Sequence, residues 1–95
     1  MTVKIIIKRR VPEGTEKELG VFLKEMRNRC NDQPGYISGE TYQRVDHPQE
    51  ILVISNWQSI ETWNRWVASA ERTEVQNKID FLLGERTDYE VYQYL

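Results

Sequence analysis

The sequence predicts an α+β domain with the ferredoxin-like order β-α-β-β-α-β, in which the helices lie on one face of an antiparallel sheet. Two observations carry this prediction. Four short segments are rich in β-branched and aromatic residues, and apolar residues recur at helical spacing in two segments between them. The chain has 95 residues, with no linker, repeat or low-complexity tract, so we expect one domain over residues 1–95.

The first strand is expected over residues 3–11, where Ile5, Ile6 and Ile7 place apolar side chains on both sides of the pleat. Thr15 and Glu18, three residues apart, predict a capping box at the start of the first helix. That helix carries one apolar stripe, formed by Leu19, Phe22, Leu23, Met26 and Cys30.

A turn at Pro34 and Gly35 separates the first helix from the second strand, which is expected over residues 36–45. Residues 46–49 form a hairpin connection to a strand over Glu50–Trp57. The run of residues 51–54 within this strand is apolar without alternation, which is typical of a strand that is buried on both faces.

Ser59 predicts an N-cap for a helix over residues 59–68, along which Ile60, Trp63 and Val67 recur at helical spacing. A second helical piece follows and ends at Gly84. It begins at Ser69 or Glu71, and its apolar side holds Val75, Ile79, Leu82 and Leu83. The closing strand is expected over residues 87–94.

Right-handed crossovers place both helical segments on the same face of the sheet, which leaves the other face uncovered. A sheet with one solvated face shows alternating polarity, but Ile6 and the apolar run at residues 51–54 put apolar side chains on both faces. A second copy of the chain is the simplest cover. We therefore expect a homodimer that associates through the sheet face.

Composition excludes several partners. The formal charge of −2 and a pI near 5.4 provide no electrostatic footprint for nucleic acid. The basic run at residues 8–10 is interpreted as a solvated strand end, because acidic residues follow it directly. With no signal peptide pattern and no apolar stretch of the length a membrane span needs, we expect a cytoplasmic location. The single cysteine, Cys30, is predicted to be a buried, reduced thiol.

Common catalytic motifs are missing. No glycine-rich loop follows a strand, so nucleotide and flavin sites lack support. His47 is the only histidine and stands beside Pro48 in a turn, so neither a metal site nor a Ser-His-Asp or Cys-His arrangement is expected.

All three tryptophans fall within ten residues, at Trp57, Trp63 and Trp66. One interpretation is that they fill the core where a helix crosses the sheet. The other is that Trp66, on a neighbouring helical face, forms the flat wall of a pocket for a planar ligand.

The chain resembles the antibiotic biosynthesis monooxygenase (ABM) domains over nearly its whole length. The resemblance rests on the order of elements, the turn Pro34-Gly35-Tyr36, and the block Ser55-Asn56-Trp57-Gln58-Ser59 with Trp63, Trp66 and Ser69. It implies a dimeric α+β barrel, joined sheet to sheet, with one pocket per subunit between sheet and helices. Some members of the family oxidise polycyclic phenols or hydroquinones with molecular oxygen and no cofactor, and others degrade haem.

The haem-degrading branch uses an asparagine on the first strand, a tryptophan on the second helix and a histidine ligand about ten residues later. Trp66 matches the tryptophan, but Ile7 and Gln76 stand at the asparagine and histidine positions. Haem degradation is therefore not expected.

The resemblance favours a cofactor-independent monooxygenase that acts on a small aromatic or quinol without flavin, haem or metal. The candidate catalytic residues are Trp66, Asn56 and Arg72, and the candidate substrate-binding residues are Trp63, Tyr42, Gln76 and Ile7. Each polar candidate has a structural alternative: Asn56 ends its strand, Tyr42 packs in the dimer barrel, and Arg72 and Gln76 lie on a solvated helix face. The alternative functions are a non-catalytic dimeric binding protein for a planar metabolite and a purely structural dimer.

Overall fold

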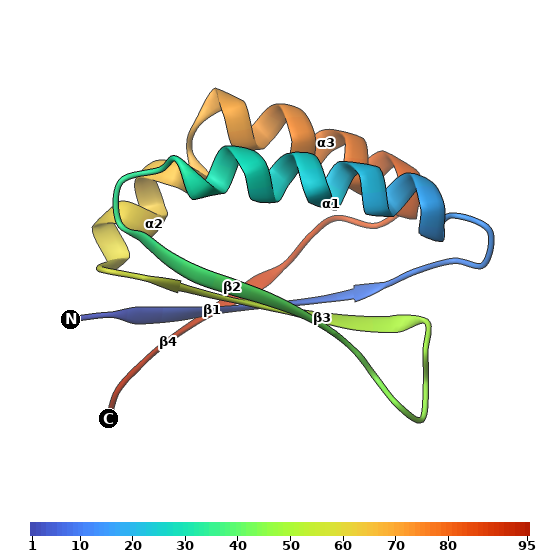
Figure 1. Ribbon diagram of the computed structural model, residues 1–95, viewed down its shortest axis with the longest axis horizontal. Coiled ribbons are helices and arrows are strands. Elements are labelled where there is room, and N and C mark those ends of the chain that lie inside the picture. The colour runs from blue at the N-terminus through green and yellow to red at the C-terminus, as the bar shows by residue number, and fades with distance from the viewer.

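Three helices lie above a twisted sheet in the computed structural model, which describes all of residues 1–95 (Figure 1). The elements in chain order are β1 (Val3–Arg10), α1 (Glu16–Asn31), β2 (Tyr36–Gln43), β3 (Glu50–Trp57), α2 (Ile60–Val67), α3 (Ala70–Leu83) and β4 (Tyr89–Gln93). The predicted order is confirmed, although the strands over 36–45 and 87–94 are shorter than expected.

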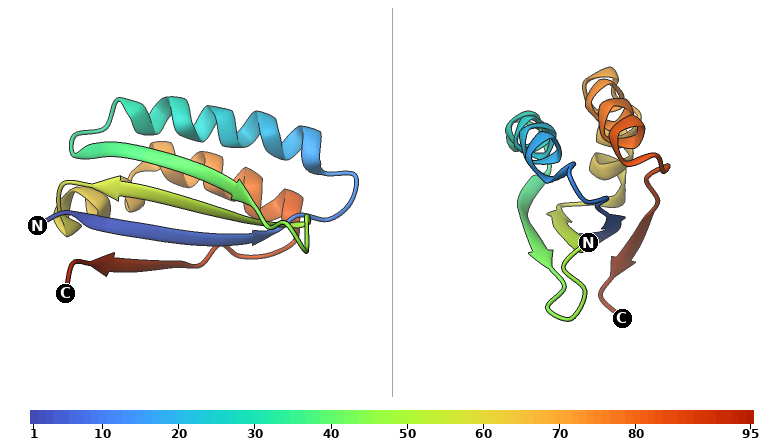
Figure 2. Two further views of the ribbon diagram at one scale, coloured as in Figure 1. Left: turned by 60° about the horizontal axis from the view of Figure 1, so that its bottom comes forward. Right: turned by 90° about the vertical axis from the view of Figure 1, so that its right-hand side faces the viewer.

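The sheet has the strand order β2-β3-β1-β4, and every neighbouring pair is antiparallel. The helices all lie on one of its faces, as the end-on view in Figure 2 shows. This arrangement is the ferredoxin-like α+β fold that the sequence predicted. It leaves the opposite face of the sheet without a covering element (Figure 2).

The buried apolar side chains form two clusters between the sheet and the helices. One joins the N-terminal half of β1 to α2 and contains Val3, Ile5, Ile7, Cys30, Trp57, Trp63 and Trp66. The other joins α1 to α3 and contains Val11, Leu19, Val75, Ile79 and Leu83. The helical stripes predicted for α1 and α3 therefore face inward, and the prediction that Cys30 is buried is confirmed.

The start of α1 corrects one prediction. Thr15 has no side-chain capping bond, because its own backbone is already helical (φ −102°, ψ −3°). Its hydroxyl instead donates to the carbonyl of Pro12 at 2.7 Å. A capping box occurs at α2, where Ser59 is extended and exchanges hydrogen bonds with Thr62, so the predicted N-cap at Ser59 is confirmed.

The uncovered face of the sheet carries both apolar and charged side chains. The register places Ile6 opposite Ile54 on this face, and Lys4 opposite Asn56. Ile6 and Ile54 are only half-buried, while Tyr42 and Tyr92 are 49% and 52% exposed. Apolar residues therefore do lie on both faces of the sheet. None of the helices is long and apolar enough to pass through a bilayer.

Gly35 connects the turn before β2 to the start of α2. It has a positive φ of 87°, and its carbonyl accepts a hydrogen bond from the backbone N–H of Gln58 at 2.8 Å. A Cβ at this position would overlap the side chain of Thr62, which belongs to the capping box of α2. Gly14 has a similar φ of 91°, but nothing lies within 4 Å of a Cβ there.

We predict that Gly35→Ala lowers the free energy of unfolding by about 3 kcal/mol, because left-handed strain adds to the overlap with Thr62. Gly14→Ala carries the strain alone and is expected to cost about 1 kcal/mol. Urea unfolding followed by tryptophan fluorescence measures both values. Equal costs for the two variants would show that the packing against Thr62 contributes nothing.

Candidate functional site

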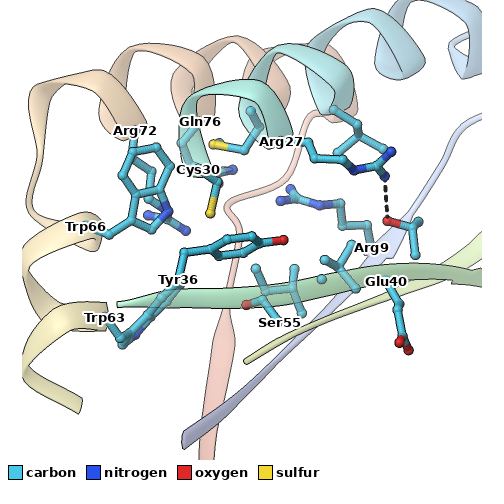
Figure 3. A pocket seen from close by; sticks show the side chains of 16 residues that line it. Arg9, Arg27, Cys30, Tyr36, Glu40, Ser55, Trp63, Trp66, Arg72 and Gln76 are labelled. Atoms are coloured by element: carbon cyan, nitrogen blue, oxygen red, sulfur yellow. Dashed lines mark hydrogen bonds between the residues drawn. The ribbon is translucent and has the colours of Figure 1, made fainter. Parts of the chain in front are cut away.

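A cavity of about 90 Å³ lies between the helix-covered face of the sheet and helices α1, α2 and α3 (Figure 3). Its apolar walls come from β1, β3, α1 and α2, and include Ile7, Val53, Met26 and Trp66. Its polar groups come from all four of β1, β2, β3 and α3 and also from α1, and the buried ones are Arg9 on β1 and Arg72 and Gln76 on α3. The cavity therefore lies at the junction of the two apolar clusters.

The tryptophans form the wall at the α2 end. Trp66 is 3% exposed and stacks on Trp57 with ring centroids 6.4 Å apart and an interplanar angle of 24°. Trp63 meets Trp57 edge to face at 5.6 Å. Trp63 and Trp66 also line the cavity. The same side chains therefore fill the core and line a cavity, and the binding of a planar ligand there stays a prediction.

Arg72 reaches the cavity from the first turn of α3. It is 8% exposed and makes no ion pair within 4 Å. Its guanidinium lies 5.4 Å from the ring centroid of Trp63 and 5.9 Å from that of Tyr89, which are cation–π distances. Burial lowers the pKa of Arg72. The group is held in place by aromatic rings, with no carboxylate as partner.

A second guanidinium, from Arg9 on β1, lines the same cavity and is 6% exposed. Its Nη1 donates to the hydroxyl of Thr87 at 2.8 Å, and its Nε is buried without a partner. Burial lowers the pKa of Arg9 to about 10, an effect opposed by Asp80 and reinforced by Arg72. A guanidinium keeps its charge at neutral pH even when it is buried, so both arginines are positively charged and repel each other.

Gln76 is fixed by a polar network behind the cavity. Its Nε2 donates to Asp80 Oδ1 at 2.8 Å and to Thr87 Oγ1 at 2.5 Å, and the Thr87 hydroxyl donates to the same carboxylate. Because a carboxylate only accepts, this contact fixes the orientation of the amide. Gln76 Oε1 is consequently left buried with no donor.

The structure brings five of the seven candidate residues to this cavity: Ile7, Trp63, Trp66, Arg72 and Gln76. Arg72 and Gln76 are both buried, so the alternative in which they lie on a solvated helix face is excluded.

The structure does not bring Asn56 and Tyr42 to the cavity. Both lie on the uncovered face, because they pair across the sheet with Lys4 and Leu52, whose side chains point away from the helices. Asn56 accepts from Lys4 Nζ at 2.7 Å and donates to Ser38 Oγ at 3.0 Å. The Tyr42 hydroxyl donates to Glu40.

Arg9 and Tyr36 were not among the candidates, although both line the cavity (Figure 3). The expectation that Arg9 lies at a solvated strand end is wrong, because its side chain is only 6% exposed. Its position continues the inward alternation of Ile5 and Ile7, and this spacing is the signal that predicts its burial. Tyr36 extends over Gly39, where a Cβ would lie 2.6 Å from the tyrosine hydroxyl oxygen.

The donor set of the cavity does not fit a haem iron or another metal. No histidine lines it, and His47 is exposed in the loop between β2 and β3. Burial raises the pKa of the Cys30 thiol to about 12, so no thiolate is present at neutral pH. The chain holds no group of three or more His, Cys, Asp or Glu side chains that could share an ion.

Solved structures share this fold at low sequence identity. A conserved protein from Methanosarcina mazei superimposes with a TM-score of 0.91 and 16% identity, covering 100% of this chain and 94% of that one. SnoaB, a cofactor-independent oxygenase from Streptomyces nogalater, gives a TM-score of 0.87 and 14% identity, covering 99% of this chain and 93% of SnoaB. These likenesses establish the fold.

Sequence comparison identifies curated relatives and a family. Protein SchA of Streptomyces halstedii is 26% identical over 78 residues, which are 82% of this chain and 20% of SchA. A 42.8 kDa protein of the whiE locus in Streptomyces coelicolor is 26% identical over 72 residues, or 76% of this chain and 18% of that protein. The chain thus spans about a fifth of the length of these relatives. The model of the antibiotic biosynthesis monooxygenase family matches residues 2–78, and the chain belongs to that family.

Proposed function

We propose that this protein is a cofactor-independent monooxygenase that oxidises a small aromatic or quinol substrate with molecular oxygen. The observation that carries the proposal is the pairing, in one cavity, of a flat tryptophan wall at Trp66 with the buried, unpaired guanidinium of Arg72. An aromatic surface orients a ring, and a desolvated cation stabilises the anion that the ring must become.

The reaction needs no electron source other than the substrate. A quinol that has lost a proton transfers one electron to oxygen, and the resulting radical pair combines at a ring carbon to form a hydroperoxide. Loss of water then leaves a new carbonyl oxygen on the ring. One quinol and one O₂ give one hydroxyquinone and one H₂O, with all four electrons supplied by the substrate. The protein's tasks are to favour the deprotonated form and to keep the ring in place.

The cavity residues divide these tasks. Arg72 stabilises the phenolate, because a guanidinium keeps its charge when buried. Trp63 and Trp66 hold the ring, and Ile7 on β1 contributes to the sheet side of the cavity. Gln76 Oε1 is buried without a donor, and it accepts from a substrate hydroxyl when the side chains that cover it move. No carboxylate or imidazole points into the centre of the cavity, so the proton leaves to solvent.

The size of the cavity favours a single ring. A dry engineered cavity of about 150 Å³ holds benzene. The present volume of about 90 Å³ is smaller, so the half-buried side chains of α1, Leu23 and Met26, must move for a ring to enter. A polycyclic substrate requires several times this volume.

The absence of a cavity base supports a second candidate function, a non-catalytic binding protein for a planar metabolite. Such a protein needs the aromatic wall and the polar contacts of Gln76 and Arg72, but no route for proton transfer. Binding without oxygen consumption distinguishes it from the oxygenase.

We also propose that the protein is a homodimer joined through the uncovered sheet face. Ile6, Leu52 and Ile54 form an apolar strip there, flanked by the exposed rings of Tyr42 and Tyr92. A second copy of the strip would bury these residues, and a self-complementary surface is what a twofold dimer requires.

The first prediction from this function concerns oxygen uptake. Protein stripped of metal is expected to consume oxygen saturably with single-ring hydroquinones or simple catechols, and not with naphthohydroquinones or anthrones, which are too large for the cavity. Replacing Arg72 by Met removes the anion partner and is expected to lower kcat by about 100-fold. Arg65→Met removes an exposed guanidinium on α2 and is the matched control, expected to retain the wild-type rate. An oxygen electrode measures all three rates.

Heat-inactivated protein is measured in parallel, and its rate of oxygen uptake, which is due to autoxidation, is subtracted. Uptake that is unchanged in Arg72→Met would contradict the assigned role of the guanidinium. Quenching of tryptophan fluorescence by quinones, with no uptake across the panel, would support the binding protein instead.

A second prediction concerns the dimer. Ile6→Asp places a charge in the centre of the apolar strip and is expected to yield monomer in sedimentation velocity experiments. Val21→Asp changes a residue that is 61% exposed on α1, and is expected to remain dimeric. A dimeric Ile6→Asp variant would rule out association through this face.

A third prediction follows from the reactivity of quinone products. Quinones alkylate thiolates, and Cys30 lines the cavity in which the quinone forms. Because burial raises the pKa of its thiol to about 12, Cys30 is expected to stay unmodified by benzoquinone at pH 7 in the native protein. Intact mass spectrometry checks this, with protein unfolded in urea as the reactive control. Rapid adduct formation in the native state would show that the thiol is accessible and ionised.

A further inference from the structure

Two buried guanidiniums with no ion pair share one cavity. Arg9 comes from β1 and Arg72 from α3, and the two side chains are 6% and 8% exposed. Neither lies within 4 Å of a carboxylate oxygen. Figure 3 shows both side chains extending toward the space between α1 and the sheet. Buried charges in proteins are ordinarily paired, so this arrangement calls for an explanation.

The surrounding carboxylates do not balance the two charges. Asp80 is the one carboxylate that acts on both guanidiniums, and its Oδ1 is occupied by Gln76 and the Thr87 hydroxyl. Glu40 lines the rim, but Figure 3 shows its carboxylate directed away from Arg9. The lining holds three guanidiniums, those of Arg9, Arg27 and Arg72, and one carboxylate, that of Glu40. With Asp80 behind the lining counted as well, the resting cavity keeps a net positive charge.

This excess charge determines which ligand suits the cavity before any reaction occurs. A neutral quinol leaves both guanidiniums unpaired until it loses a proton. A ligand that is already anionic pairs with them on entry, and the planar fork of a guanidinium matches the two oxygens of a carboxylate. The resting protein is therefore suited to an aromatic acid.

Two further unpaired atoms specify the remaining polar groups of the ligand. Gln76 Oε1 is a buried acceptor without a donor, and its orientation is fixed by the contact of Nε2 with Asp80. A ligand hydroxyl supplies the missing donor. Trp63 Nε1 is a buried donor without an acceptor, so it favours an oxygen on the ligand as well. Both residues line the cavity that holds the guanidiniums.

We propose that the cavity binds a small hydroxylated aromatic acid, with its carboxylate on Arg9 and Arg72 and its hydroxyl donating to Gln76 Oε1. This rests on the proposed function in taking the cavity as the substrate site, and it narrows the substrate class from any quinol to an anionic, single-ring one. In the resting complex the carboxylate lies on both guanidiniums. In the oxygenase, Arg72 is shared with the phenolate once the ligand hydroxyl has lost its proton, and Arg9 keeps the carboxylate.

Isothermal titration calorimetry with three matched probes tests the proposal. Meta-hydroxybenzoate carries both groups, meta-hydroxybenzamide replaces the charge by a neutral group of similar shape, and benzoate lacks the hydroxyl. We expect the hydroxybenzoate to bind at least tenfold more tightly than the amide, and more tightly than benzoate. Equal affinity for the acid and the amide would overturn the proposal. An affinity for sodium sulfate equal to that for the hydroxybenzoate would also overturn it, because the guanidiniums would then bind any small anion.

Variants locate the contact. Arg72→Met and Arg9→Met each remove one charge with little change in volume, and each is expected to reduce the preference for acid over amide at least tenfold. Arg65→Met, on the exposed side of α2, is the control and is expected to keep the full preference. Should one core variant fail to fold, the other still decides the question. A preference that survives in a folded core variant would place the acid elsewhere.

The two proposals fail separately. Tight binding of the hydroxybenzoate without oxygen uptake on any quinol would remove the oxygenase and leave the acid site. Rapid oxygen uptake on neutral quinols, together with equal affinity for acid and amide, would remove the acid site and leave the oxygenase.

Discussion

The packing of Trp57 against three other aromatic rings is the contact on which the rest of the site depends. Trp57 is fully buried at the end of β3, and its ring centroid lies 5.4 Å from that of Tyr36, 5.6 Å from Trp63 and 6.4 Å from Trp66. Helix α2 has only 8 residues, too few to be stable alone, so these contacts hold it on the sheet. Ser69 then accepts from the Arg72 N–H and donates to the Trp66 carbonyl, which sets the start of α3.

The polar part of the core lines the cavity. Of 15 buried residues, Arg9, Arg72 and Gln76 are the charged or polar ones, and all three line it. In a chain of 95 residues each of them displaces apolar area that would stabilise the fold. Their burial is opposed by desolvation and only partly relieved by Thr87, Asp80 and aromatic rings. A local conflict of this kind, in an otherwise consistent sequence, is characteristic of functional sites.

Sequence periodicity was sufficient for the order of elements, because the helical stripes and β-branched runs are strong and well separated. The same periodicity was insufficient to predict on which face of the sheet each strand residue lies. Trp57 points inward, so its neighbour Asn56 must point outward, but the unbroken apolar run of residues 51–54 obscures this alternation. On β2, an irregularity between Tyr36 and Ser38 shifts the register, so Tyr42 faces away from the helices although Tyr36 faces them. A bulge of this kind has no signature in a single sequence.

Strand β1 couples the cavity to the uncovered face. Ile7 and Arg9 point into the cavity. Lys8, which lies between them, and Ile6, which precedes Ile7, point outward. A slip of one residue in the pairing of β1 would exchange these sets and remove the guanidinium from the site. In the proposed dimer, burial of Ile6 therefore does more than join two subunits, since it also holds the register that directs Arg9 inward. The proposed ligand recognition on one face and the proposed association on the other would both follow from a single strand alignment.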